Sequence, residues 1–211
     1  MTSIGMIYAH DLNHGIGCRG RLAWKHPLDI GLFWETIGQM PVVVGYNTWE
    51  TSKKYFLKRR PHATHLVLSS KKRPSSEKNV HVMNFERLSD VISNGGFGDV
   101  DISQVWVTGG AQVYGYFEEC ADVVVETTIA VTTPYDAWFD HRKNGFFSEQ
   151  AIFSFKQVEN VPEAHTTYWI DCSRSKLTVN RLLCNLGLEW FTTEAQMNDF
   201  WKENGDLSWA L

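Results

Sequence analysis

Cysteine is scarce in this sequence, and its spacing shows no pairing pattern. The 211 residues include four cysteines, which lie far apart and form no CxxC pair. Disulfide frameworks and cysteine zinc sites are built from paired or closely spaced cysteines, so the sequence predicts reduced thiols in a cytosolic protein. The eight histidines also lack the spacing of metal ligands, and we expect no metal site.

Long hydrophobic runs and a strong net charge are also missing. No apolar run approaches the roughly 20 residues that a membrane helix needs. The N-terminal stretch MTSIGMIYAHD lacks the basic segment and the long apolar segment of a signal peptide. The net charge is -4 at pH 7, without the basic surplus typical of nucleic-acid binding. We therefore expect a cytoplasmic protein with no membrane and no nucleic-acid partner.

Short strand-like and helix-like segments alternate along most of the chain. With 43% hydrophobic residues, the chain is long enough for one well-packed domain. Runs such as PVVVG at 41–45 and HLVLS at 65–69 are typical of strands buried on both faces. The pattern predicts an α/β domain with a central, mostly parallel mixed sheet flanked by helices, and with an antiparallel C-terminal edge. We expect strands at 3–9, 41–45, 65–69, 80–83, 105–108 and 123–131, a final hairpin of 153–158 and 166–171, and helices at 27–40, 47–53, 85–93 and 111–119.

Asp29 is the only carboxylate in the stretch 16–33, where a glycine-rich loop and Trp24 lead into a helix-like segment. In a helix that begins just before it, Asp29 shares a face with Phe33. A carboxyl group buried on such a face has a raised pKa and is a candidate proton donor near neutrality. The alternative is an exposed first-turn acid that follows Pro27 and complements the helix dipole.

Glycine marks two junctions, at 45–48 and 109–112, where a predicted strand ends and a helix begins. Helix N-termini offer free N–H donors to phosphate, and glycine lets a backbone approach a pyrophosphate closely. Two such junctions suit one dinucleotide, although glycine is also common at these turns for conformational reasons alone. No GxGxxG fingerprint supports a Rossmann assignment. The run SSKKR at 69–73 suits an extra phosphate, such as the 2′-phosphate of NADP, or is a solvated basic turn.

Taken together, these stretches resemble dihydrofolate reductase over roughly residues 3–172. Each motif is weak alone, but the set occurs in the order of the family. The resemblance implies a dihydrofolate-reductase-like catalytic domain at 1–172 that uses NADPH to reduce dihydrofolate to tetrahydrofolate by hydride transfer to C6. The matching stretches are Ala9, 16–17, Trp24, PLD at 27–29, Phe33, PVVVG at 41–45, TWE at 48–50, LVLSS at 66–70, VTGGAQVY at 107–114 and Thr127.

The resemblance also implies residue roles. Asp29 holds the 2-amino group and N3 of the pterin and assists protonation of N5, Trp24 places a water nearby, and Thr127 hydrogen-bonds the acid. The loop 17–23 is a mobile lid over the nicotinamide, and the Gly109–Gly110 peptide is cis. The expected substrate-binding residues are Ile7, Tyr8, Ala9, Asp29, Ile30, Phe33 and Arg60. The expected cofactor-binding residues are Ala9, Ile16, Gly17, Gly45, Tyr46, Asn47, Thr48, Ser69, Ser70, Lys71, Arg73, Gly109, Gly110, Ala111, Gln112, Val113 and Tyr114.

Three positions depart from the family pattern. The arginine that grips the glutamate carboxylate of folate corresponds to Ala63, so this contact is missing unless an arginine of the 59–60 pair replaces it. The family's cofactor arginine corresponds to Tyr46, which leaves the 2′-phosphate to the run 69–73. The proline before the key tryptophan is Ala23 here, a change that loosens the lid.

Residues 173–211 lie beyond the resemblance. Thr193 and Gln196 form a capping box, and the apolar residues around them predict a helical extension that packs on its own core or forms a homodimer contact, or alternatively docks a protein partner. Two other functions remain open for the whole chain. One is a related pterin or pyrimidine reductase on the same fold, and the other is a catalytically weak scaffold or interaction protein.

Overall fold

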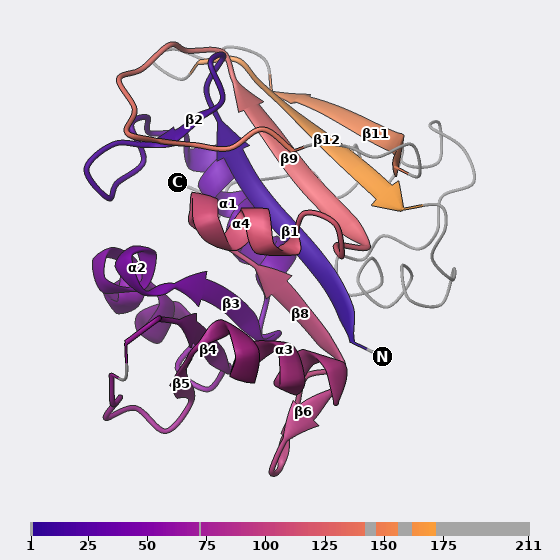
Figure 1. Cartoon of the computed structure of the whole chain (residues 1–211). Coiled ribbons are helices and arrows are strands. Elements are labelled where there is room, and N and C mark those ends of the chain that lie inside the picture. The colour runs from indigo at the N-terminus through magenta and orange to yellow at the C-terminus, as the bar shows by residue number, and fades with distance from the viewer. Residues whose placement is uncertain (1, 72, 142–146, 156–161, 172–211) are drawn as a thin grey trace.

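The fold is built around one large mixed sheet (Figure 1). The computed structural model describes residues 2–71, 73–141, 147–155 and 162–171. The strands of the sheet are β1 (Ser3–His10), β3 (Val42–Gly45), β4 (His65–Leu68), β5 (Val80–Met83), β8 (Gln104–Val107), β9 (Val123–Ile129), β11 (Phe147–Phe155) and β12 (Ala164–Asp171). Within the described residues their order is β11-β12-β9-β1-β8-β3-β4-β5, and only the β11–β12 and β12–β9 pairs are antiparallel. The predicted α/β domain with a mostly parallel sheet and an antiparallel C-terminal edge is confirmed.

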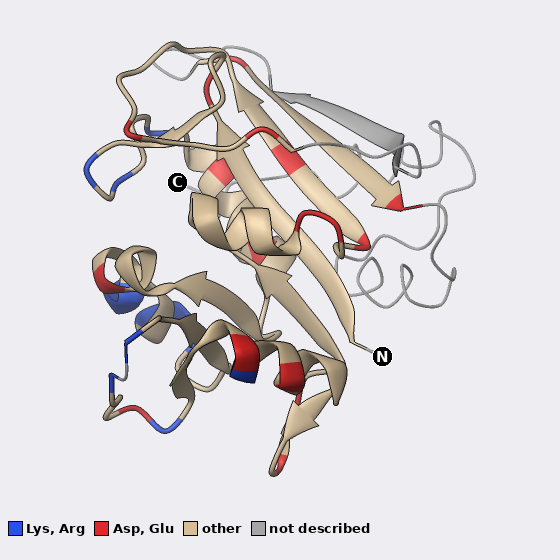
Figure 2. Cartoon of the chain, in the orientation of Figure 1, with Lys and Arg blue, Asp and Glu red and all other residues tan. Residues whose placement is uncertain are grey.

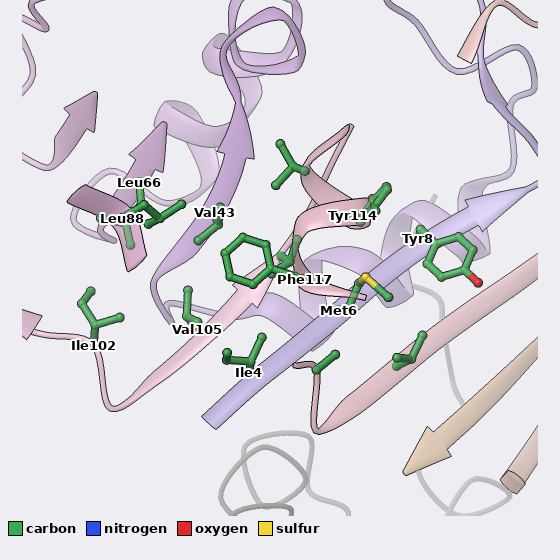
Figure 3. Close-up of a cluster of buried hydrophobic side chains, with 14 of the residues drawn as sticks. Ile4, Met6, Tyr8, Val43, Leu66, Leu88, Ile102, Val105, Tyr114 and Phe117 are labelled. Carbon is green, nitrogen blue, oxygen red and sulfur yellow. The ribbon is translucent and has the colours of Figure 1, made fainter. Parts of the chain in front are cut away.

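Helices cover both faces of this sheet. They are α1 (Pro27–Ile37), α2 (Tyr46–Arg59), α3 (Phe85–Ser93) and α4 (Ala111–Phe117). Helices α1 and α2 contribute to one buried cluster, and α3 and α4 contribute to another, which Figure 3 shows. Val42 belongs to the first cluster and its neighbour Val43 to the second, because successive side chains of a strand point to opposite faces. The expected burial of this strand on both faces is confirmed.

The largest difference between the predicted and observed elements concerns α2. The sequence predicts a helix at 47–53, and the structure extends it to Arg59. The added residues at its C-terminal end, KYFLKR, are half charged, and these charges interrupt the apolar pattern. Trp49 and Phe56 are seven residues apart and both buried, which shows that one face of the longer helix packs on the core. The helix ends just before Pro61, where the residue preceding a proline disfavours the helical conformation.

Smaller differences between the predicted and the observed elements occur at the ends of other helices and strands. Helix α1 ends at Ile37 rather than residue 40, because Gly38 adopts a φ of +44°. The first strand of the final hairpin spans Phe147–Phe155 rather than 153–158, of which 156–158 lie outside the described residues. The extension 173–211 with its capping box also lies outside them, so its role stays a prediction. Four strands of two or three residues were not predicted: β2 (Gly15–Gly17), β6 (Gly96–Phe97), β7 (Val100–Asp101) and β10 (Ala137–Trp138).

His65 is a histidine held inside the core by β4. It is fully buried, and its ring packs against the rings of Trp49 and Phe56, at centroid distances of 5.1 and 5.6 Å. Desolvation, and then the nearby charge of Arg60, lower the pKa of His65 to about 4. The folded protein therefore keeps this ring neutral at pH values where the unfolded chain protonates it.

The difference in the pKa of His65 between the folded and the unfolded protein predicts a loss of stability in acid. Because the folded pKa lies below the ordinary histidine value, the contribution of His65 is present above about pH 6.5 and is lost as the pH falls toward 4, to a total of roughly 3 kcal/mol. The free energy of unfolding in urea, measured at pH 7.5, 5.5 and 4.5, should fall less steeply for His65→Asn than for the wild type. The exposed His62, changed to Asn, is the matched control. Equal slopes for the wild type and His65→Asn would contradict the assignment.

Candidate active site

Asp29 lies in the first turn of α1 with its side chain buried. Only 8% of the residue is exposed, although Pro27 starts the helix beside it. Desolvation raises the pKa of Asp29 to about 7, and a hydrogen bond with Thr127 lowers it in part. The alternative of an exposed acid that merely complements the helix dipole is therefore wrong. A carboxyl group with this pKa still carries a proton in about half of the molecules at pH 7, so it can act as a proton donor.

One hydroxyl from a distant part of the chain, that of Thr127, hydrogen-bonds this acid. Thr127 lies on β9, directly opposite Thr166 of β12, and their hydroxyl oxygens are 2.8 Å apart. Ala9 of β1 is the register partner of Thr127 on the other side. The indole Nε1 of Trp24 is buried and has no acceptor among the described residues. That unsatisfied N–H fits the water that the resemblance places beside the acid.

The remaining residues expected to bind substrate divide between the two faces of the sheet. Ile7 belongs to the buried cluster on the side of α1, where Phe33 packs against it. Ile30 is half-buried on the same helix. Tyr8 belongs to the cluster on the opposite face, among the side chains labelled in Figure 3, because it follows Ile7 in an extended strand. Only the backbone of Tyr8 is therefore left for the predicted substrate contact.

The side chain of Tyr8 takes part in a buried polar network instead. Its hydroxyl donates to one carboxylate oxygen of Glu126 at 2.6 Å, and Trp169 Nε1 donates to the other at 2.7 Å. His10 Nε2 lies 3.5 Å from the first of these oxygens. Burial and the charge of Glu126 raise the pKa of Tyr8, which keeps its hydroxyl protonated. This network joins β1, β9 and β12 on the face away from Asp29.

The two glycine junctions lie against each other at the carboxyl ends of β3 and β8. The N–H of Gly45 donates to the carbonyl of Gly109 at 2.6 Å, and the Gly109–Gly110 peptide is cis, as the resemblance predicts. A Cβ on Gly45 would lie 3.0 Å from Val113, and one on Gly110 would lie 3.0 Å from Thr48. Packing alone therefore favours glycine here, and the same bare backbone is open to close approach by a pyrophosphate. The other expected cofactor contacts at these junctions are Tyr46 and Asn47 at the start of α2, and Ala111, Gln112 and Tyr114 in α4.

A basic loop follows β4 near the start of α2 (Figure 2). The guanidinium carbon of Arg73 lies 4.0 Å above the ring centre of Tyr46, a cation–π contact that joins the loop to the helix. The hydroxyl of Ser69 accepts a hydrogen bond from the N–H of Lys71 at 3.2 Å. The structure thus brings together residues that the sequence linked only as candidates for a 2′-phosphate. Ser70 is exposed beside them, and residue 72 lies outside the described residues.

Arg60 is buried at the end of α2, with 1% of the residue exposed. Its Nε donates to the carbonyl of Gly38 at 2.6 Å, and its Nη2 donates to the carbonyl of Met40. Its Nη1 has no acceptor among the described residues. Desolvation lowers the pKa of Arg60 to about 10, so it remains a cation at neutral pH. Ala63, where the family has its arginine, is buried and brings no charge.

The predicted lid, with Ile16 and Gly17 at its base, is tied to a segment that sequence reasoning missed. Strand β2 pairs with β10, and the N–H of Asp136 donates to the carbonyl of Gly17 at 3.1 Å. In return, the N–H of Arg19 donates to the Asp136 carboxylate at 2.8 Å. Asp136 lies 117 residues from Arg19, so no local pattern marks the pair. These contacts hold the base of the loop 17–23 in place.

Comparison with known proteins agrees with this geometry. The fold is that of dihydrofolate reductase: a solved dihydrofolate reductase from Enterococcus faecalis, in complex with NADP(H) and RAB-propyl, superposes with a TM-score of 0.67 at 24% identity, over 80% of this chain and 96% of that one. The sequence profile of the dihydrofolate reductase family matches residues 3–170. The chain therefore belongs to the dihydrofolate reductase family.

Two curated proteins are similar to parts of the chain. A dihydrofolate reductase of Mycobacterium leprae is 32% identical over 115 residues, which are 54% of this chain and 64% of that protein. A segregation and condensation protein A of Mycoplasmoides gallisepticum is 24% identical over 122 residues, which are 58% of this chain and 19% of that protein. The chain thus spans less than two thirds of the length of either relative.

The described part of the chain shows neither a metal-binding cluster nor a membrane-spanning helix. It contains no group of three His, Cys, Asp or Glu side chains arranged to hold a metal ion. None of its helices combines the length and the apolar character needed to cross a membrane.

Proposed function

We propose that this chain reduces 7,8-dihydrofolate to 5,6,7,8-tetrahydrofolate with NADPH. The observation that carries the proposal is the buried Asp29, whose pKa is raised to about 7, in a chain of this family. Its carboxyl group holds the 2-amino group and N3 of the pterin and assists delivery of a proton to N5. NADPH supplies the hydride that is added to C6. Trp24 places the water through which a proton reaches the ring, and Thr127 orients the acid.

The same assignment gives roles to the surrounding residues. Ile7, Ala9, Ile30 and Phe33 pack around the pterin and its attached ring and exclude water. The Nη1 atom of Arg60, which has no acceptor among the described residues, binds a carboxylate of the substrate and so replaces the arginine missing at position 63. The glycine junctions and the first turns of α2 and α4 hold the pyrophosphate of NADPH, and the lid 17–23 closes over the nicotinamide.

The direct test is the loss of NADPH absorbance in the presence of purified protein, with and without dihydrofolate. Oxidation that depends on dihydrofolate supports the proposal. Binding of NADPH without such oxidation would contradict it and would favour a different pterin-like substrate or a non-catalytic role.

We also expect Arg73 and Ser69 to select NADPH over NADH. Charge-assisted hydrogen bonds to a phosphate contribute about 1.5–3 kcal/mol, so the double variant Arg73→Ala, Ser69→Ala should lower kcat/KM for NADPH by about 10–100-fold. Because NADH lacks the 2′-phosphate, kcat/KM for NADH should stay the same. Lys78→Ala, which removes an exposed cation from the same loop, is the control. An equal loss with both cofactors would exclude a role in phosphate recognition.

A further inference from the structure

His26 caps the helix that carries Asp29. It precedes Pro27, has an extended backbone with φ of -132° and ψ of 99°, and is fully buried. Its Nδ1 accepts a hydrogen bond from the backbone N–H of Asp29 at 3.1 Å. Its Nε2 lies 3.1 Å from the carbonyl oxygen of Pro162, two residues before β12.

These two partners determine the protonation state of the ring. The N–H of Asp29 is only a donor, so Nδ1 carries no proton, and the carbonyl of Pro162 is only an acceptor, so Nε2 carries one. The imidazole is therefore neutral when both bonds form. Desolvation lowers the pKa of His26, which agrees with a neutral ring at physiological pH. Helix caps are usually Ser, Thr, Asp or Asn, whose shorter side chains would not span from the helix to a second segment in this way.

Strand β12 and the residues before it thus reach Asp29 at two points, its backbone N–H and its carboxyl group. Through Pro162 and His26 they hold the backbone N–H of Asp29. Through Thr166 and Thr127 they reach its carboxyl group. Among the described residues, a titratable group that interacts with this carboxyl is Tyr114 of α4, whose pKa is raised by burial and by the charge of Asp29.

We infer that His26 is a positioning residue for Asp29. Its neutral imidazole ties the first turn of α1 to the Pro162 carbonyl, and so sets the direction of the Asp29 carboxyl without adding a charge next to it. The inference rests on the proposed function only in taking Asp29 as the acid of the reaction; the geometry itself involves no substrate. No pattern in the sequence marks this residue, because Pro162 is 136 positions away.

Two substitutions separate the electrostatic effect of residue 26 on Asp29 from its effect on the geometry of that residue. His26→Asp keeps a capping oxygen but adds a negative charge in the same turn, so it should raise the pKa of Asp29 by about one unit. His26→Asn keeps a neutral cap but loses the bond to Pro162. It should leave the pKa of Asp29 within about 0.3 units of the wild-type value and lower kcat for dihydrofolate about 3–10-fold, with the affinity for NADPH unchanged.

The pKa of Asp29 is measured by carbon-13 NMR of the full chain with carboxyl-labelled aspartate, in the absence of substrate and cofactor. The signal of Asp29 is identified by its loss in Asp29→Asn. The matched control is Asn84→Asp, which makes the corresponding charge change at the cap of α3, where Asn84 accepts from the N–H of Arg87. This control should alter neither the pKa of Asp29 nor kcat.

An unchanged pKa of Asp29 in His26→Asp, or wild-type kcat in His26→Asn, would each overturn the inference. Circular dichroism and NADPH binding verify that both variants are folded. If the wild type does not reduce dihydrofolate but the NMR shift in His26→Asp occurs, the proposed function fails while the electrostatic coupling of position 26 to the Asp29 carboxyl stands. If the wild type does reduce dihydrofolate and neither variant has its expected effect, the proposed function stands and the positioning role fails.

Discussion

Asp29→Asn is expected to lower dihydrofolate-dependent turnover at pH 7 by about 10²–10⁴-fold, the usual contribution of a positioned acid or base. An amide has nearly the same shape and keeps hydrogen-bonding atoms near Thr127, so the fold and the affinity for NADPH should not change. Steady-state kinetics and NADPH fluorescence titration measure the two effects. Unchanged turnover would remove Asp29 from the mechanism.

The same substitution should make the folded protein more stable. The pKa of Asp29 is raised to about 7 in the fold, so burial of its charged form costs stability increasingly as the pH rises from about 4 to 7. The Asn variant avoids this cost, which reaches roughly 4 kcal/mol above pH 7. Urea unfolding should therefore show a gain at pH 8 that vanishes at pH 4. Asp90→Asn, at an exposed position on α3, is the control and should show no comparable gain.

Arg60→Met should have the second-largest effect, on both stability and substrate affinity. The substitution preserves much of the aliphatic stem but removes the guanidinium hydrogen bonds to the carbonyls of Gly38 and Met40. Hydrogen bonds from a charged donor contribute about 1.5–3 kcal/mol each, so the loss of these two should lower the free energy of unfolding by roughly 3 kcal/mol. Loss of the contact from Nη1 to a substrate carboxylate should also raise KM for dihydrofolate by about tenfold or more.

The neighbouring Arg59 is the matched control for this prediction. It is exposed, and its guanidinium lies 5.3 Å from the ring centre of Trp34. An exposed contact of this kind contributes about 0.5–1 kcal/mol, so Arg59→Met should alter stability little and KM not at all. A rise in KM for Arg59→Met, with none for Arg60→Met, would show that Arg59 and not Arg60 makes the carboxylate contact.

Local patterns in the sequence determined much of the fold. The runs 41–45 and 65–69 predicted buried strands because short apolar runs without polar alternation suit a strand covered on both faces. The glycines at 109–110 and the acid at position 29 were recognised by residue type and by order along the chain. The end of α2 was missed because Lys and Arg interrupt the apolar pattern there, although Trp49 and Phe56 stand at helical spacing. The two- and three-residue strands are too short to show a period.

The tertiary structure decided what these residues can do. Asp29 is a buried acid rather than an exposed one because β9 brings Thr127 to it from 98 positions away and the packed core excludes water. The roles of His26 and Arg60 likewise come from carbonyls at Pro162, Gly38 and Met40. Residue type and short-range periodicity are properties of the chain itself. Burial, and the pKa that follows from it, depend on which distant segments lie alongside, and only the folded protein establishes that.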